Sequence, residues 1–185
     1  VALYPLIGWG AVALGFALLP VVAFLHGIAS EWFGHAGIRI KPAACTIHER
    51  CYWWIERHWK FSETFLKYAF AGTPFRPIVM RLLGLKVGRN VFDDGSSIPE
   101  KQLVEIGDGA TINAQVIIQG HSLEDGLYKA DRIRIGARAT LAPCSFVHYG
   151  AEMEPGSVLD ADSFMMKGAR STAGTRWRGN PARLG

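Results

Sequence analysis

The sequence predicts a mainly β chain: a left-handed parallel β-helix of hexapeptide repeats, preceded by a transmembrane helix and a helical connector. Two observations lead to this fold class. The C-terminal half repeats itself every six residues, and the first thirty residues contain no charged side chain. The expected boundaries are 1–30 for the transmembrane helix, 31–86 for the connector and 87–185 for the β-helix domain.

The repeat is carried by an aliphatic residue that returns every six positions and by a small residue four positions after it. The aliphatic positions are Ile135, Leu141, Val147, Met153, Leu159 and Met165. The small positions are Ala139, Ser145, Ala151, Ser157, Ser163 and Ala169. An earlier block with the same spacing consists of Ile106, Ile112 and Ile118.

A period of six fits neither a strand nor an α-helix, which repeat every 2 and about 3.6 residues. It is typical of a solenoid whose triangular coil holds about 18 residues, with one hexapeptide on each side. We expect the aliphatic side chains to fill the prism and the small ones to lie at its corners. Glycines are expected to supply turns with positive φ, at Gly88, Gly107, Gly109, Gly136, Gly150, Gly156 and Gly168.

The N-terminal segment is apolar over a length that suits a membrane. The stretch from Ala2 to Leu25 is long enough to cross a hydrocarbon layer of about 30 Å. The alternative is a buried helix of a larger soluble core. Because the chain starts with Val1 inside this apolar segment, we expect it to be a piece of a longer, polytopic protein.

The chain carries a net charge of +4, and much of the basic surplus follows the apolar segment. These residues are Arg39, Lys41, Arg50, Arg57 and Lys60. Positive charge beside a membrane span favours the cytoplasmic side, so the β-helix domain is expected there. The same charge also suits anionic lipid or a phosphate-bearing partner. The repeats contain no basic cluster interleaved with stacking aromatic residues, which argues against a nucleic-acid partner.

The connector is rich in aromatic residues, namely Trp53, Trp54, Trp59, Phe61, Phe65 and Tyr68. Tyrosine and tryptophan beside charged side chains suit the headgroup layer of a membrane. The alternative is a helix packed onto the β-helix domain. The three cysteines, Cys45, Cys51 and Cys144, lack metal-ligand spacing, so we expect free, mostly buried thiols and no metal site.

The repeat is interrupted once. Ile118 and Ile135 are seventeen residues apart, one short of three repeats. The polar centre of this segment predicts a loop pushed out of the prism, and loops on rigid scaffolds often carry function. His121 stands where the regular coil ends. Its imidazole can take up and release a proton near neutral pH, although a histidine beside a loop is more often a surface or structural residue.

Two motifs frame this break: GHS from Gly120 to Ser122 and GNPAR from Gly179 to Arg183. Together with the hexapeptides, they resemble the maltose and galactoside O-acetyltransferases. The resemblance implies trimers with acetyl-CoA bound between neighbouring prisms and His121 as the general base. It also implies that Lys167 and Arg183 lie near the cofactor phosphates, while the alternative for both is an ordinary surface cation.

A second resemblance comes from the order of the segments. A membrane span, an aromatic connector, the entry RLLGLKVG from Arg81 to Gly88 and a hexapeptide domain with a histidine are similar to one group of synthetases. They resemble the C-terminal region of nonribosomal peptide synthetases of the ε-poly-lysine synthetase type. This implies sibling β-helix domains that form a pseudo-trimer, and an aminoacyl group delivered on the phosphopantetheine arm of a carrier domain.

Three functions follow from these observations. The first is transfer of an aminoacyl group from a carrier-bound pantetheine thioester to the amine of an amino-acid acceptor, which forms an amide or isopeptide bond. The second is a membrane-anchored O- or N-acetyltransferase that uses acetyl-CoA and is a homotrimer. The third is a non-catalytic structural domain that completes an interface for its siblings. The presence of His121 favours the first two.

Overall fold

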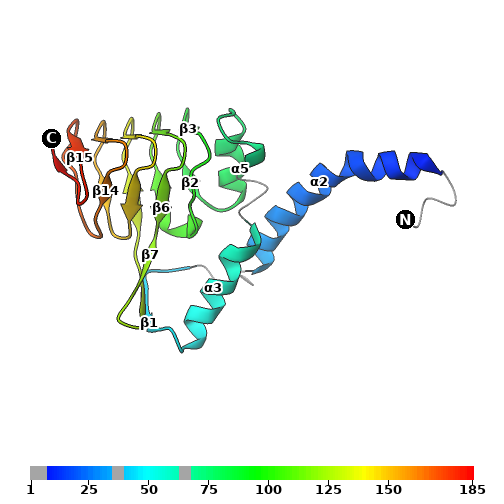
Figure 1. Ribbon diagram of the computed structural model, residues 1–185, viewed down its shortest axis with the longest axis horizontal. Coiled ribbons are helices and arrows are strands. Elements are labelled where there is room, and N and C mark those ends of the chain that lie inside the picture. Colours follow the sequence, from blue (N-terminus) through cyan, green and yellow to red (C-terminus); the bar gives the residue numbers. More distant parts are fainter. Residues whose placement is uncertain (1–7, 35–39, 63–67) are drawn as a thin grey trace.

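The computed structural model describes residues 8–34, 40–62 and 68–185. It consists of a prism of short parallel strands, a small antiparallel sheet beside the prism, and a long N-terminal helix that leaves from one end (Figure 1). The side chains of several connector residues named above lie outside the described residues. They are Arg39, Arg57, Trp59, Lys60, Phe61 and Phe65.

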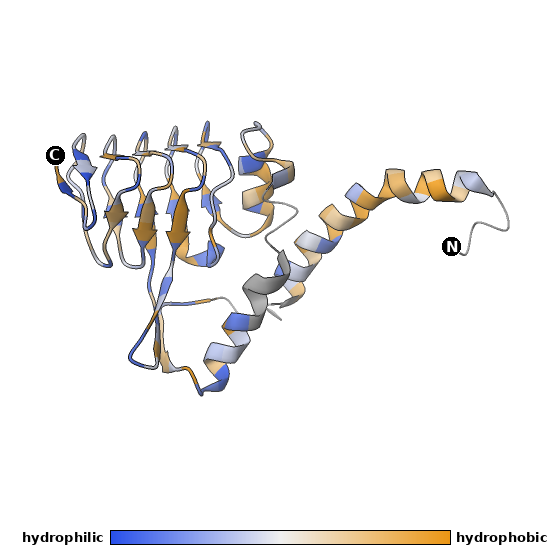
Figure 2. Cartoon of the chain, in the orientation of Figure 1, coloured by the Kyte–Doolittle hydropathy of each residue, from blue (hydrophilic) through white to orange (hydrophobic). Residues whose placement is uncertain are grey.

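The long helix is α2, Trp9–Gly34. Its 26 residues span about 39 Å at the usual rise per residue. Most of its apolar side chains are exposed, from Trp9 to Phe33. Figure 2 shows that the helix is hydrophobic over most of its length. It is one helix that is long and apolar enough, by length and composition, to cross a membrane. The helix extends past the expected boundary at residue 30, to Gly34, and its Glu31 is buried and paired inside the protein.

The prism has three faces, each a sheet of parallel strands, except for the last strand of the second face. The first face contains β2 (Lys86–Val87), β4 (Val104–Ile106), β9 (Ile133–Ile135) and β12 (Glu152–Met153). The second contains β3 (Phe92–Asp93), β5 (Thr111–Ile112), β10 (Thr140–Leu141), β13 (Val158–Leu159), β15 (Arg176–Arg178) and an antiparallel β16 (Arg183–Leu184). The third contains β6 (Ile117–Gln119), β11 (Phe146–His148) and β14 (Phe164–Met165).

The hexapeptide prediction is confirmed residue by residue. Ile112, Leu141 and Leu159 are in register on neighbouring strands and are fully buried, as are Ile118 and Val147 on the next face. Of the small residues, Ala139, Ser145, Ala151 and Ser157 are completely buried. One aliphatic side chain per side therefore fills the prism, and the coils stack at the strand spacing of about 4.8 Å.

The glycines divide into two kinds, so the expected positive φ is wrong for some of them. Gly109, Gly150, Gly156 and Gly168 do adopt a positive φ. Gly88, Gly107 and Gly136 do not, and they are needed for space. A Cβ on Gly136, for example, would lie 2.6 Å from the backbone nitrogen of Pro155 in the next coil.

The interruption of the repeat is a β-hairpin, where the sequence predicted a loop. Strands β7 (His121–Glu124) and β8 (Leu127–Ala130) pair antiparallel, and Asp125 and Gly126 form the turn with positive φ. A further strand, β1 (Ala43–Thr46), pairs with β8. The hairpin projects away from the prism, and β1 lies along it (Figure 1).

The connector contains β1 in addition to its two described helices, α3 (Arg50–Ser62) and α5 (Arg76–Leu82). A disulfide joins Cys45 in β1 to Cys51 in α3, and the single free cysteine of the chain, Cys144, is exposed. The expectation of free, mostly buried thiols is therefore wrong. The short turn between β1 and α3 brings the two cysteines together, which their separation of six residues does not reveal on its own.

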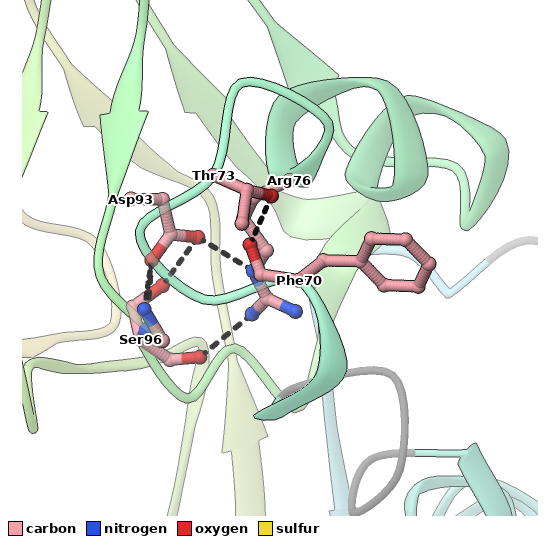
Figure 3. A network of polar contacts seen from close by, with 6 residues as sticks. Phe70, Thr73, Arg76, Asp93 and Ser96 are labelled. Carbon is pink, nitrogen blue, oxygen red and sulfur yellow. Dashed lines mark hydrogen bonds and ion pairs between the residues drawn. The ribbon is translucent and has the colours of Figure 1, made fainter.

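The end of the prism nearest α2 is closed by α5 and a buried polar network (Figure 3). The guanidinium of Arg76 donates to the Asp93 carboxylate at 3.1 Å and to the Ser96 carbonyl at 3.0 Å. The same carboxylate accepts hydrogen bonds from the backbone of Gly95 and from Ser96. These groups are all buried. Their polar atoms are satisfied by hydrogen bonds to one another, as buried polar groups require.

Candidate active site

His121 is the first residue of β7 and lies where the chain leaves the prism. Its Nδ1 is 2.6 Å from Oε1 of Glu100, which precedes the 3₁₀ turn η1 (Lys101–Leu103). The Glu100 side chain is 2% exposed and that of His121 is 16% exposed. A carboxylate at this distance accepts the Nδ1 proton, which leaves the lone pair of the neutral ring on Nε2.

Gly120 makes this short contact sterically possible. Its backbone N–H donates to Oε2 of Glu100 at 2.9 Å, so both carboxylate oxygens are engaged. A Cβ at this position would lie 3.1 Å from Cβ of Glu100 and 3.4 Å from Cδ1 of Leu103. The glycine of the GHS motif therefore allows the carboxylate to approach the start of β7.

Tyr128 of β8 covers one face of the His121 ring. Its ring stacks on the imidazole with centroids 5.4 Å apart and an interplanar angle of 21°. Tyr128 is the centre of a second small core with Cys45 and Leu103, against which Tyr52 and Ile55 of α3 pack. Burial, with the nearby Glu100 charge, raises the pKa of the Tyr128 phenol, so the hydroxyl stays protonated. Within the described parts of the chain this buried hydroxyl has no hydrogen-bond partner.

The backbone of His121 is held by the third face of the prism. Its carbonyl oxygen accepts hydrogen bonds from Nε2 of His148 at 3.1 Å and from the Gln119 amide at 3.0 Å. His148 is surrounded by the rings of Phe146, Phe164 and Tyr149. Burial lowers the pKa of His148, which favours the neutral ring, and the contact with the carbonyl requires the proton to be on Nε2.

The second ring nitrogen of His121, Nε2, makes no contact of this kind among the described residues. Across residues 8–34, 40–62 and 68–185, Nε2 of His121 has no hydrogen-bond partner. The imidazole is thus fixed by Glu100 at one nitrogen and by Tyr128 at one face, while the other nitrogen can accept a proton. Such an arrangement suits general-base activation of an amine or a hydroxyl.

The two basic residues that the resemblance places near cofactor phosphates belong to different faces of the prism. Lys167 follows β14, and its Nζ is 2.6 and 2.7 Å from the two carboxylate oxygens of Glu124 at the end of β7. Arg183 is exposed on β16, a strand of the second face at the C-terminal end of the prism. Lys167 is therefore close to the hairpin but already paired, and its cofactor role and that of Arg183 stay predictions.

Sequence reasoning found His121 and missed the residues that hold it. Glu100 lies in an irregular turn of the preceding coil, where no repeat position marks it. Tyr128 and His148 belong to no motif, although Tyr128 lies in the segment that interrupts the repeat. Among the described residues there is no group of three histidines, cysteines or carboxylates arranged to hold a metal ion.

One sequence relative shares a large part of the chain. Over 118 residues, 64% of this chain, the sequence is 34% identical to Delta-poly-L-ornithine synthetase of Acinetobacter baumannii. The match covers 9% of that protein, so the chain spans under a tenth of its relative's length. This similarity confirms the expected resemblance to poly-amino-acid synthetases. No protein-family model matches the sequence.

Two solved structures share the fold. A maltose O-acetyltransferase from Clostridium difficile 630 has a TM-score of 0.51 at 18% identity, covering 77% of this chain and 91% of that one. A galactoside acetyltransferase in complex with coenzyme A has a TM-score of 0.51 at 17% identity, covering 77% and 85%. They confirm the left-handed parallel β-helix and the resemblance of its fold to this group of acetyltransferases.

Proposed function

We propose that the domain is an acyltransferase that moves an aminoacyl group from a pantetheine thioester to the amine of an amino-acid acceptor. The observation that carries the proposal is the His121 imidazole, held at Nδ1 by a buried carboxylate while Nε2 has no partner in the described structure. This pair lies where the repeat is interrupted, beside a projecting hairpin. The similarity to Delta-poly-L-ornithine synthetase supports an amino acid as the acceptor.

The proposed step is a direct aminolysis. Nε2 of His121 removes a proton from the acceptor ammonium, and the resulting amine attacks the thioester carbonyl. The C–N bond forms, the attacking nitrogen releases its second proton to solvent, the C–S bond breaks, and the departing thiolate receives a proton from the imidazolium. Glu100 stabilises the imidazolium through the Nδ1 hydrogen bond, and a general base of this kind contributes about 10²- to 10⁴-fold to the rate.

The expected partners follow from this chemistry. We propose that a carrier domain presents the phosphopantetheine arm, and that sibling β-helix domains in a pseudo-trimer, or identical chains in a homotrimer, surround it. We further propose that α2 anchors the domain to a membrane, with lipid around its exposed apolar side chains and the β-helix on the cytoplasmic side. The connector, residues 31–86, would lie at the membrane interface.

The test of the chemistry is His121→Ala in the full-length protein. We expect product formation to fall by roughly 10²- to 10⁴-fold, because Ala leaves no proton acceptor at this position. His48→Ala is the matched control, since His48 is an exposed histidine outside the site. Amide product is measured by mass spectrometry after incubation with the loaded carrier and free amino acid. Unchanged product formation in His121→Ala would remove His121 from the mechanism.

A second candidate is acetyl transfer from acetyl-CoA, which the galactoside acetyltransferase in complex with coenzyme A favours through its shared fold. The two candidates differ in the form of the donor. Turnover with free acetyl-CoA, without any carrier domain, would establish the second candidate. Turnover that requires an acylated carrier would establish the first. In both, His121 has the same role, so the variant described above does not distinguish them.

A further inference from the structure

A buried ion pair connects the end of α2 to the turn that carries Glu100. Nζ of Lys101 lies 3.5 Å from Oε2 of Glu31, and both side chains are only 4% exposed. Glu31 belongs to the last turn and a half of α2, seventy residues earlier in the chain. The carboxylate therefore comes from the apolar helix and the ammonium from the β-helix domain.

The surrounding contacts show that this end of α2 is part of the domain. Phe24 and Ile28 of α2 pack against the main core, and the Phe24 ring lies 5.7 Å from that of Phe70. The indole N–H of Trp32 donates to the carbonyl of Leu82 at the end of α5 at 2.8 Å. The helix is thus fixed to the prism over its last three turns.

Lys101 directly follows Glu100 in the chain, and the side-chain carboxylate of Glu100 orients His121. Glu100 is the residue before η1, and its carbonyl accepts the backbone N–H of Leu103 at 2.9 Å. Lys101 begins η1. A shift of the Lys101 side chain out of its buried position would therefore move the turn that directs the Glu100 carboxylate at Nδ1 of His121.

We propose that Glu31 is a positioning residue for the imidazole: by holding Lys101, the last turns of α2 fix the orientation of Glu100 and of His121. This deepens the proposed function, on which it rests only in treating His121 as the catalytic base. Removing the charge of Glu31 weakens the hold of α2 on the buried Lys101 ammonium, so the Lys101 side chain is expected to shift from its position in the pair. A displacement of about 1 Å at a catalytic group is enough to slow a reaction by about 10²-fold.

The test uses the full chain in detergent micelles, with ¹⁵N-labelled histidine and three variants. Glu31→Gln removes the charge of one partner, and the exchange Glu31→Lys with Lys101→Glu restores a pair with reversed signs. Glu105→Gln is the control, because Glu105 pairs with Lys86 at 3.8 Å on the exposed first face. The His121 signals are assigned from their loss in His121→Ala. The tautomer of His121 and its titration are then followed by NMR, and kcat and KM are measured in the transfer assay.

The wild type and Glu105→Gln are expected to show His121 with its proton on Nδ1. In Glu31→Gln we expect a mixture of tautomers and a kcat lower by on the order of tenfold, with KM nearly unchanged. The exchanged pair is expected to return both quantities toward the wild type. An unchanged tautomer in Glu31→Gln would overturn the proposal, even with a shifted titration, because loss of a nearby charge alone produces such a shift.

The NMR readout separates this proposal from the proposed function. A changed tautomer in Glu31→Gln with full activity in His121→Ala would support the positioning role and refute the catalytic one. An unchanged tautomer with lost activity in His121→Ala would do the reverse. If Glu31→Gln fails to fold, the exchanged pair still tests the proposal, because its tautomer and kcat are expected to approach those of the wild type.

Discussion

At the scale of single residues, the contact between Glu100 and His121 is the feature with the most direct chemical consequence. Glu100→Gln keeps the size of the side chain and removes the carboxylate that holds Nδ1. We expect kcat to fall by roughly 10²- to 10⁴-fold, because an amide no longer selects the tautomer with its lone pair on Nε2. Steady-state rates measure the change, with Glu105→Gln as the control. Wild-type kcat in Glu100→Gln would show that the carboxylate has no part in orienting the base.

His148 leads to a prediction about pH. Burial holds its pKa below the ordinary value of 6.5, so the folded state resists protonation while the unfolded chain takes up a proton. Because the unfolded state then binds more protons, the free energy of unfolding falls as the pH falls from about 7 toward 5. His148→Gln removes the titration and keeps an N–H for the carbonyl of His121.

We expect thermal midpoints measured from pH 8 to pH 5 to fall less steeply in His148→Gln than in the wild type. Above pH 7 the two proteins are expected to differ little, since the amide replaces the hydrogen bond. Parallel pH profiles would show that another group is responsible for the acid sensitivity.

The sequence predicts one residue of the candidate site, and there is a physical reason why it does not predict the others. His121 stands out because it interrupts a strict period. Glu100 contacts it only because consecutive coils stack, which places residues 21 positions apart side by side. Tyr128 reaches it across a hairpin. Contacts that depend on stacking and pairing leave no local pattern around each partner.

At the scale of elements, the sequence located the break in the repeat correctly, but the segment there forms a hairpin and not the predicted loop. The segment has four-residue strands on either side of an Asp125–Gly126 turn, and this dipeptide is a strong hairpin signal. Its high polarity predicted a loop instead. Strand β1 carries even less signal, because AACT gains its pairing from a strand more than eighty residues later. The regular coils were predicted correctly because each has its own hexapeptide pattern.

The cap formed by α5 leads to a prediction of stability. Arg76→Met removes the guanidinium and leaves the Asp93 carboxylate in a buried site without its ionic partner (Figure 3). Breaking one side of a buried pair costs about 3–5 kcal/mol in free energy of unfolding, so the thermal midpoint is expected to fall strongly. Lys86→Met breaks an exposed pair on the first face and is expected to change it by under about 1 kcal/mol. Equal losses in the two variants would show that the network contributes no more than a surface pair.

At the scale of the whole molecule, the contacts between α2 and the prism join the β-helix domain to an apolar helix. Up to Val22 the apolar side chains of α2 are mostly exposed, whereas from Phe24 onward one side of the helix is packed against the domain or paired with it, and Trp32 and Phe33 stay exposed. The hydropathy of the first thirty residues predicted the helix. It did not predict where the helix becomes part of the protein, because Glu31 and Lys101 are both ordinary surface residues by type, and only the fold shows that they are buried together.

The division of α2 gives the last prediction, which concerns lipid contact. Single cysteines that carry a nitroxide label are placed at Phe16 in the exposed part of α2 and at Glu105 on the prism, in a Cys144→Ser background. In lipid nanodiscs we expect the label at position 16 to be accessible to oxygen and protected from a water-soluble nickel complex, because oxygen concentrates in hydrocarbon. The label at position 105 is expected to show the opposite order. A label at position 16 that the nickel complex reaches freely would place this helix in water. Protection of that label from both reagents would indicate that another protein segment covers the helix.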